Sequence, residues 1–367
     1  MPPMNSADSD ISTPPGNFVL FSFGADVRLV AEAEIREIFP HIPPFLWLEG
    51  NPGEESGIAL AALPVNFEAC VSRLDRTRPI FMRHIAPVQR TVALTGGDED
   101  LTTLRRAVRE LSAEIDPART VSVQSRLLGD KTPRPYSRTE LNRALFEEIA
   151  DVSGATLDAR APAQVVSVCC TADTAFVGVS ETAQNRSPWP GGERRFKREE
   201  GQIARSEFKL LEALEVFALT LPESGVALDV GAAPGGWTRV LRQKNLRVVA
   251  VDPADMDERV LADPGVEIVR HAIQYHRPSS PFDVIVNDLT MDARDSVIAM
   301  LALRAYLKPG GIGIITLKLP RHEVSGQTLL KFVRTDIARL ATGFAVIGAR
   351  HLFHNRSEIT VALTTLP

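Results

Sequence analysis

The most restrictive feature of this 367-residue chain is a glycine-rich loop between two segments that read as β-strands. Residues 226–230 form a short, mostly aliphatic segment, and three glycines then fall within positions 231–236. Glycines at such a turn let backbone N–H groups approach a ligand that side chains would otherwise keep away. A second strand-like segment, residues 246–251, ends at Asp252. This order is typical of the half-site that binds the ribose of a nucleotide cofactor.

The spacing of these glycines differs from that of a dinucleotide-binding loop. Gly231 is followed by Ala-Ala-Pro-Gly-Gly-Trp, which does not fit G-x-G-x-x-G. Pro234 stiffens and widens the loop, which suits a nucleoside carrying a sulfonium and an amino acid better than a pyrophosphate. Such a turn can also merely close a βα unit, but the acids on either side of it favour S-adenosylmethionine (SAM). The expected cofactor-binding residues here are Asp229, Gly231, Ala232, Ala233, Pro234, Gly235, Gly236, Trp237 and Asp252.

Length and composition predict a soluble protein of two or three domains. A chain of 367 residues exceeds what one hydrophobic core usually supports, and 44% of its residues are apolar. Residues 1–16 carry prolines among Ser and Asp and predict a disordered tail. They lack the apolar region of a signal peptide, and no later run approaches the ~20 apolar residues of a membrane span. Three cysteines offer neither a disulfide framework nor paired zinc ligands, so we expect a cytoplasmic protein without a metal.

The net charge of −5 argues against a nucleic-acid partner, but the charge is unevenly distributed. Residues 119–143 and 186–198 are both rich in Arg and Lys. Each cluster by itself is most often a solvated face, whereas two of them ahead of a methyl-donor site favour contact with RNA. The candidate RNA-binding residues are Arg126, Lys131, Arg134, Arg138, Arg194, Arg195, Lys197 and Arg198, with Arg321 near the catalytic region.

Three domains are expected. Residues 17–95 read as a small α+β unit, and Gly96-Gly97 with three acids marks its end. Residues 96–200 contain two helical patterns and a β-hairpin. Residues 201–367 alternate strands and helices, which predicts a mostly parallel sheet covered on both faces. In this last domain we expect a helix over residues 293–307.

Several ionisable residues fall at strand ends of the third domain. A buried-type strand ends at Asp288, and another, residues 311–317, is followed by Lys318. In open α/β sheets ligands bind at the carboxyl ends of the strands, so both side chains are expected beside the glycine loop. The last strand begins at Glu358, and it brings this acid to the same rim if it runs antiparallel to its neighbours.

A fourth candidate, Lys209, lies on a helical segment spanning residues 204–217. Apolar residues recur there at helical spacing, at Phe208, Leu211, Leu214 and Phe217, and are expected to face a core. With Ser206 as the N-cap, Lys209 falls in the first turn, where the helix dipole disfavours a cation. By itself such a lysine is more often a solvated surface residue.

The chemistry of a ribose 2′-hydroxyl explains why these residue types would gather. The hydroxyl is a very weak acid, so its methylation calls for a group that accepts its proton during attack on the sulfonium methyl. A lysine serves only when its amine is partly neutral, a state that burial favours and carboxylates oppose. Methylation of a base nitrogen would instead predict an Asn-Pro-Pro-aromatic strand end, and Asn287-Asp-Leu-Thr290 is not one.

In their order along the chain these residues resemble the FtsJ-type ribose 2′-O-methyltransferases, whose hallmark is a Lys-Asp-Lys-Glu tetrad. The matching motifs are Ser206-Glu-Phe-Lys-Leu-Leu-Glu212, Asp229-Val-Gly-Ala-Ala-Pro-Gly-Gly-Trp237, Asn287-Asp288, Leu317-Lys-Leu-Pro320 and Asn355-Arg-Ser-Glu358. Within that family, Pro79-Ile-Phe-Met-Arg-His84, Ser187-Pro-Trp-Pro-Gly-Gly192 and Leu352-Phe-His-Asn-Arg356 resemble the enzymes that modify a cytidine of bacterial 23S rRNA. The resemblance implies a ferredoxin-like domain, a THUMP RNA-binding domain and a Rossmann-like domain whose seven-stranded sheet has an antiparallel last strand.

The resemblance also implies roles for individual residues. Lys318 would accept the proton, while Lys209, Asp288 and Glu358 would position it and the ribose. Asp252 would bind the cofactor ribose, and Asp288 would also border the cofactor. Where the family tends to have an Asp that reads the adenine amine, this chain has Ala272. The adenine contact would then pass to Gln274 or to a backbone carbonyl.

Two other functions stay open from the sequence. One keeps 2′-O-methylation but moves it to tRNA or to another rRNA position. The other is a non-catalytic SAM- and RNA-binding assembly factor with a decayed site, against which the intact tetrad argues. An NAD-dependent dehydrogenase would need the dinucleotide loop that this sequence lacks.

Overall fold

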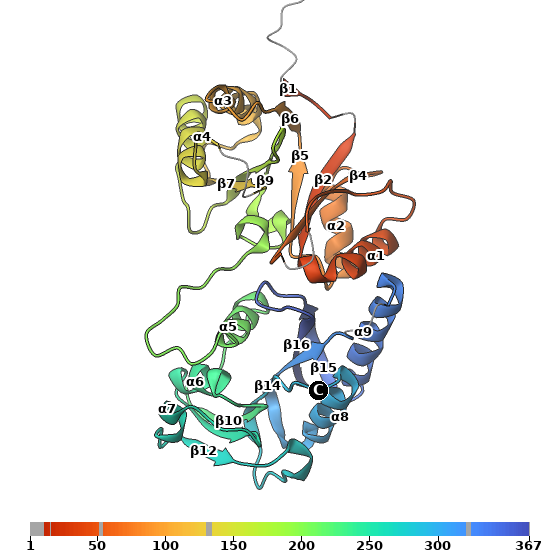
Figure 1. Cartoon of the computed structure of the whole chain (residues 1–367), viewed down its shortest axis with the longest axis vertical. Helices are drawn as coiled ribbons and strands as arrows, with labels where there is room; N and C mark the ends of the chain where they lie inside the picture. Colours follow the sequence, from red (N-terminus) through yellow and green to blue (C-terminus); the bar gives the residue numbers. More distant parts are fainter. Residues whose placement is uncertain (1–10, 15, 51–53, 130–133, 321–323, 367) are drawn as a thin grey trace, which may run out of the picture. The chain divides into compact units, whose positions relative to one another are not determined.

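The computed structural model describes residues 11–14, 16–50, 54–129, 134–320 and 324–366 of the chain. The chain forms two compact units, residues 1–28 with 35–193 and residues 29–34 with 194–367. Both units combine helices with sheets (Figure 1). Most of the expected N-terminal tail lies outside the described residues. The expectation of disorder over residues 1–16 is nevertheless corrected at β1 (Ile11–Ser12), because this short strand pairs antiparallel with a strand of the first unit.

The first unit contains two sheets. The four-stranded sheet has the order β3-β4-β2-β5 and is antiparallel throughout. The five-stranded sheet has the order β1-β6-β9-β8-β7, in which β7 and β8 form a parallel pair. Their strands are β2 (Asn17–Phe23), β3 (Leu46–Glu49), β4 (Gly57–Leu63), β5 (His84–Val88), β6 (Arg90–Ala93), β7 (Val121–Leu127), β8 (Gln164–Cys170) and β9 (Thr174–Glu181).

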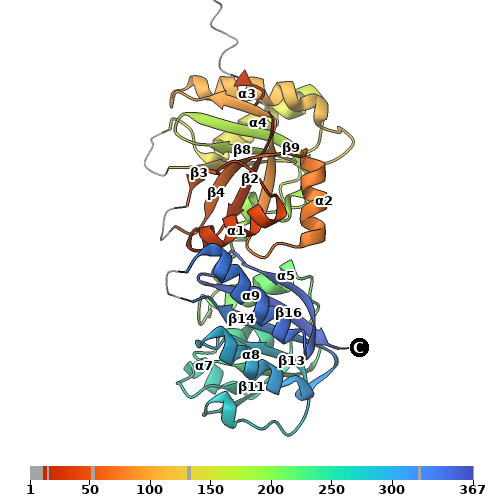
Figure 2. The ribbon, with the colours of Figure 1, turned by 90° about the vertical axis from the view of Figure 1, so that its right-hand side faces the viewer.

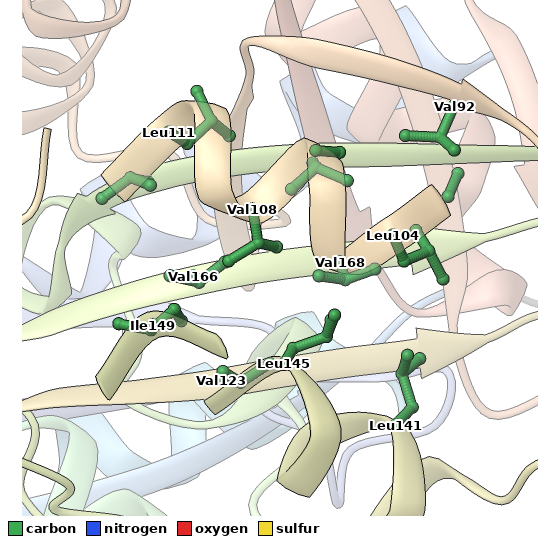
Figure 3. Packing of buried hydrophobic residues seen from close by; sticks show 14 of the residues in the cluster. Val92, Leu104, Val108, Leu111, Val123, Leu141, Leu145, Ile149, Val166 and Val168 are labelled. Atoms are coloured by element: carbon green, nitrogen blue, oxygen red, sulfur yellow. The ribbon is translucent and has the colours of Figure 1, made fainter. Parts of the chain in front are cut away.

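Two helices, α3 (Glu99–Leu111) and α4 (Arg138–Ser153), cover the five-stranded sheet with apolar residues at helical spacing (Figure 3). The labelled residues of this core are Val92, Leu104, Val108, Leu111, Val123, Leu141, Leu145, Ile149, Val166 and Val168. A capping box between Ser137 and Glu140 begins α4, and Gly154 at φ 74° ends it, so both ends are encoded locally. The first unit also contains α2 (Phe67–Thr77), whereas α1 (Arg28–Ile38) is divided, because its residues 29–34 belong to the second unit.

The chain passes from one sheet of the first unit to the other between β5 and β6. Only Gln89 separates these strands, yet β5 pairs with β2 and β6 pairs with β9. The boundary predicted at Gly96-Gly97 therefore lies after the chain has already entered the five-stranded sheet. Turn-forming residues mark a turn and carry no information about which strands pair across it.

The second unit is built on a seven-stranded sheet of order β12-β11-β10-β13-β14-β16-β15. All neighbours are parallel except β16, which runs antiparallel to both β14 and β15. This confirms the expected mostly parallel sheet with an antiparallel last strand. The strands are β10 (Gly225–Val230), β11 (Leu246–Val251), β12 (Val266–Val269), β13 (Phe282–Asn287), β14 (Leu307–Lys318), β15 (Phe344–Arg350) and β16 (Glu358–Thr365).

Helices cover both faces of this sheet. The helices α5 (Glu207–Val216) and α6 (Gly236–Gln243) pack into one core with β10, β11 and β13, whereas α8 (Ala293–Ala302) and α9 (Gly326–Leu340) lie along the other face (Figures 1 and 2). The short α7 (Glu258–Leu261) packs near β12. The expected helix over residues 293–307 is too long. It ends at Ala302, and β14 already begins at Leu307 because Leu307 pairs with Phe282 of β13.

Three of the four apolar residues expected to face a core from α5, Leu211, Leu214 and Phe217, pack against the core as partly buried residues, but they are not its most buried positions. Leu210 and Ala213 are fully buried, whereas Phe208 and Leu211 are only half-buried. Glu207 and Glu212 occupy the other buried positions of the helix. Apolar spacing therefore identifies the partly buried edge of this face and misses its centre, because two of the most buried positions carry carboxylates.

None of the helices in the described part of the chain is long and apolar enough to cross a membrane. The three cysteines, Cys70, Cys169 and Cys170, are buried free thiols. Burial raises the pKa of each thiol to about 12. These thiols are therefore protonated at neutral pH.

Candidate active site

The carboxyl ends of the parallel strands gather the polar residues of the second unit. Asp252 and Asp288 follow β11 and β13, and Lys318 is the last residue of β14. In the antiparallel pair of β14 with β16, Lys318 lies directly opposite Glu358. The first residue of the last strand therefore lies on this rim, as the sequence predicted.

Four side chains form a closed ring of opposite charges there. The Lys209 Nζ lies 3.1 Å from Asp288 Oδ2 and 2.7 Å from Glu358 Oε1. The Lys318 Nζ lies 2.9 Å from Asp288 Oδ1 and also contacts Glu358 Oε2. Each lysine thus bridges both carboxylates, so the structure brings together all four residues proposed for the tetrad.

Two members of the tetrad, Asp288 and Lys318, favour their charged forms. Burial disfavours a carboxylate at Asp288, but Lys209 and Lys318 outweigh it and lower the pKa of that acid. Burial likewise disfavours an ammonium at Lys318, but Asp288 and Glu358 outweigh it and raise the pKa of that lysine. Lys318 can accept a proton only in its neutral form, so the two carboxylates hold it in the unreactive state at neutral pH.

Lys209 is placed by contacts between the first turn of α5 and α6. Ser206 is the N-cap of α5, as expected, but its side chain caps nothing. Its carbonyl instead accepts a 2.8 Å hydrogen bond from Trp237 Nε1, and Glu207 pairs with Arg239 at 2.7 Å. The helix that carries Lys209 is thereby attached to the helix that follows the glycine loop.

The glycine loop has a backbone that other residues would not adopt without strain. Gly231 has φ 77°, and a Cβ at this position would lie 3.0 Å from backbone atoms of Leu289, next to Asp288. Gly235 has φ 114°, and a Cβ there would lie 2.5 Å from Val260 Cγ2. At Gly231 the loop therefore runs directly against the backbone of the tetrad aspartate, and the positive φ angles favour glycine at both positions.

Asp252, the predicted ribose contact, holds the loop from the other side. Its Oδ2 accepts a 3.1 Å hydrogen bond from the Ala233 N–H and its Oδ1 a 2.8 Å bond from the Ala254 N–H. A carboxylate has about four lone-pair sites, so both oxygens retain acceptor capacity for two ribose hydroxyls. Its position fits the predicted role.

Asp229 is the residue whose environment most favours a cationic ligand. It is 1% exposed, and its Oδ2 accepts a 2.6 Å hydrogen bond from Thr238 Oγ1. Its Oδ1 has no hydrogen-bond partner among the described residues. Burial, together with Asp288 and Asp252, raises the pKa of this acid to about 7. A cationic group at Oδ1 would satisfy that oxygen and favour the carboxylate, which fits the ammonium of SAM.

The expected adenine region lies after β12. Ala272 is half-buried and begins a short 3₁₀ turn over Ile273–Tyr275. Its carbonyl accepts a 3.0 Å hydrogen bond from the Tyr275 N–H and lies 3.1 Å from His271 Nδ1. Gln274 is exposed. Which of these groups reads an adenine amine stays a prediction.

Of the nine predicted RNA contacts, Lys131 and Arg321 lie outside the described residues. Two others, Arg126 and Arg134, already have partners inside the first unit. Arg126 lies between Glu193 at 2.6 Å and Glu49 at 3.1 Å, and Arg134 donates to the carbonyl of Thr171 at 2.6 Å. These guanidinium groups satisfy acceptors inside the first unit, and a cluster of basic letters cannot distinguish that use from an exposed one.

The other predicted contacts remain at the surface. Arg138, Arg195, Lys197 and Arg198 are exposed. Arg194 is half-buried: it forms two hydrogen bonds to Glu215, of 2.6 and 2.8 Å, and covers the Phe196 ring at 4.0 Å. The surface candidates in the second unit are therefore mainly Arg195, Lys197 and Arg198.

Sequence reasoning missed one residue that contacts the tetrad and one that anchors a loop leading to it. Thr316 donates a 2.6 Å hydrogen bond from Oγ1 to Asp288 Oδ1. Glu212 accepts hydrogen bonds from the Phe353 and His354 N–H groups, at 2.8 and 2.9 Å, and so anchors the loop that leads to Glu358. Strand periodicity offers a signal for Thr316, since it stands two residues before Lys318 and shares its face of β14. No group of three or more His, Cys, Asp or Glu residues within the described ranges could hold a metal ion.

The sheet order, the glycine loop after β10 and the polar rim define an α/β fold of the methyltransferase class. Residues 202–337 match the profile of the family described as FtsJ-like methyltransferase, so the chain contains an FtsJ-like domain.

Curated relatives carry the name ribosomal RNA large subunit methyltransferase M. The protein of Marinobacter nauticus is 36% identical over 211 residues, covering 53% of this chain and 56% of the relative. That of Laribacter hongkongensis is 34% identical over 200 residues, covering 51% and 55%. The chain thus aligns with about half the length of the curated relatives it matches. Among solved structures, TrmN from Thermus thermophilus aligns over 95% of this chain and 100% of its own at 17% identity, with a TM-score of 0.39 that is too low to support an argument.

Proposed function

We propose that this protein is a SAM-dependent ribose 2′-O-methyltransferase of RNA whose target is a cytidine of bacterial 23S rRNA. The observation that carries the proposal is the closed ring of Lys209, Asp288, Lys318 and Glu358 beside the glycine loop. The FtsJ-like match and the ribosomal RNA named in the relatives support the substrate class.

The proposed mechanism uses the ring to activate and hold the target ribose. When bound, SAM would supply the sulfonium methyl group, with Asp252 at its ribose and Asp229 at its ammonium. Lys318 would accept the 2′-hydroxyl proton once its amine is neutral, while Lys209 and the two carboxylates fix its direction. An alcohol at the rim would displace part of the ring's internal hydrogen bonding, which weakens the hold of the carboxylates on the Lys318 proton.

The domain assignment belongs to the same proposal. Residues 17–95 would be a ferredoxin-like domain, residues 96–200 a THUMP-like RNA-binding domain, and residues 201–367 the catalytic domain. The α+β content of the first unit supports the first two, and the FtsJ-like match supports the third.

Incubation of the protein with SAM and protein-free 23S rRNA, followed by mapping of the modified nucleotides, tests the function. A single 2′-O-methylcytidine in 23S rRNA is expected. Methylation of tRNA or of another rRNA position would show that the protein is a 2′-O-methyltransferase with a different RNA substrate. SAM and RNA binding without methylation would instead favour the assembly factor.

Asp252→Ala should mainly weaken cofactor binding. Loss of a carboxylate that accepts from ribose hydroxyls is worth roughly 1.5–3 kcal/mol, which corresponds to about a 10- to 100-fold rise in the SAM dissociation constant. Isothermal titration with SAM measures it, and Asp255→Ala is the matched control, since Asp255 lies three residues away and its side chain is 91% exposed. Unchanged SAM affinity in Asp252→Ala would show that the ribose contact is misplaced.

The RNA affinity should fall steeply with salt, because each neutralised phosphate releases a condensed cation. Reversing the exposed Lys197 and Arg198 to Glu should weaken RNA binding and reduce the salt slope by roughly 0.7 for each phosphate that is no longer neutralised. Filter binding at several salt concentrations measures the slope, with the exposed pair Lys244 and Arg247 reversed as the control. An unchanged salt slope after reversal of Lys197 and Arg198 would show that RNA binds elsewhere. The SAM affinity should stay the same in both double variants.

A further inference from the structure

Thr316 makes a direct hydrogen bond to the tetrad from inside the sheet. Its side chain is fully buried, and its Oγ1 donates to Asp288 Oδ1 at 2.6 Å. Residues two apart on a strand share a face, so Thr316 and Lys318 both project toward Asp288 from β14. We infer that Thr316 is a positioning residue for methyl transfer, which fixes the Asp288 carboxylate and thereby the amine of Lys318. The inference rests on the proposed function and goes beyond the four tetrad residues.

The two oxygens of Asp288 share Lys209 as a partner but differ in their contacts to β14. Oδ1 accepts from Thr316 at 2.6 Å, from Lys318 at 2.9 Å and from Lys209 at 3.3 Å, while Oδ2 accepts from Lys209 at 3.1 Å. Thr316 is the neutral donor among these contacts. It therefore selects one rotation of the carboxylate, with Oδ1 toward β14 and Oδ2 toward α5, without adding charge to the ring.

The hydroxyl also limits how strongly Asp288 holds the Lys318 proton. An oxygen that accepts a short hydrogen bond from Thr316 has less electron density to offer to the ammonium. Loss of this donor leaves Oδ1 to two lysines, Lys318 at 2.9 Å and the more distant Lys209 at 3.3 Å, so Asp288 binds the Lys318 ammonium more strongly and raises the pKa of that lysine further. The charged and titratable groups that face Asp288 are Lys209 from α5, Lys318 from β14, Glu358 from β16 and Asp229 from β10.

If Thr316 only filled space in the core, its hydroxyl would not need to donate to Asp288. The cross-strand neighbour Thr360 is equally buried, and its Oγ1 donates to Asn355 Oδ1 at 3.1 Å instead. Both threonines satisfy the need of a buried hydroxyl for an acceptor. Only Thr316 does so on a residue of the tetrad, which makes Thr360 a matched control for the effect of removing a buried hydroxyl at this place in the sheet.

The test compares Thr316→Val, Thr316→Ser and Thr360→Val with the wild-type protein. Thr316→Val should lower kcat about tenfold at pH 7.5, the scale of one charge-assisted hydrogen bond, while the KM for RNA and the Kd for SAM stay within about twofold. The pH at which kcat reaches half its maximum should increase by about one pH unit, because Lys318 must lose its proton to react. Thr316→Ser should behave like the wild type, and Thr360→Val should lose a similar amount of thermal stability but keep the wild-type pH profile.

The inference is overturned if Thr316→Val keeps its kcat, if its kcat falls without a shift in pH, or if Thr360→Val shows the same shift. A second measurement does not depend on RNA: the rate of reductive methylation of Lys318, followed by mass spectrometry against pH, reports the pKa of its amine. That pKa should be higher in Thr316→Val than in the wild type, and an equal pKa again overturns the inference. Wild-type protein that methylates no RNA would refute the proposed function, while the labelling still decides the role of Thr316.

Discussion

Lys318→Ala is expected to lower RNA methylation by about 100-fold or more and to leave SAM affinity nearly unchanged. The lysine amine is the proposed proton acceptor, and the structure places it between Asp288 and Glu358 at the end of β14. The cofactor loop makes its described contacts with other residues, such as Asp252 and Val251. Single-turnover methylation with saturating SAM, together with a SAM titration, separates the two effects.

Lys308→Ala is the matched control for that substitution. Lys308 lies at the other end of the same strand and pairs with Asp283 at 2.8 Å, away from the rim. Its removal should leave both methylation and SAM affinity within about twofold, the size of effect expected for a partly exposed ion pair. Parallel losses of SAM binding and turnover in Lys318→Ala would contradict its assignment as the proton acceptor.

The rim of the catalytic sheet could be predicted because it depends on topology. Parallel strands place their carboxyl ends together, which brings Asp252, Asp288 and Lys318 to one edge from sequence order alone. The prediction that Glu358 lies at the same edge depended on the last strand being antiparallel. The structure has this strand antiparallel, with Glu358 directly opposite Lys318. The glycine loop is local in sequence, so its positive φ angles follow from the residue types.

The contacts that orient the ring could not be predicted in the same way. Glu207 and Glu212 lie on the buried face of α5, where an apolar pattern is the ordinary signal. Each is buried because a distant partner satisfies it: Arg239 of α6 for the first, and the N–H groups of Phe353 and His354 for the second. Partners of this kind are set by tertiary packing, which the spacing of residues along one helix does not contain.

The partners of the basic residues in the first unit could not be predicted from the sequence either, and Arg126 is the clearest case. The sequence offers Arg126 as an RNA contact, but its side chain is only 18% exposed and bridges Glu49 on β3 to Glu193 after the last turn of the unit. Ser56 Oγ donates to the same Glu193 oxygen at 2.7 Å. The guanidinium therefore connects segments far apart in the sequence, and its loss leaves two carboxylates without their shared cation.

Arg126→Met should therefore lower the free energy of unfolding by about 3 kcal/mol, the lower end of the cost of breaking a buried ion pair from one side. Methionine keeps much of the apolar stem, so the reduced stability reports mainly the charges. Urea unfolding followed by circular dichroism measures the change, and the exposed Arg138, at the first position of α4, provides the control Arg138→Met with an effect near zero. At a temperature where both variants are folded, Arg126→Met should bind RNA with the wild-type salt slope, since its charge already serves two internal carboxylates. A stable Arg126→Met protein with a reduced salt slope would return this residue to the RNA surface.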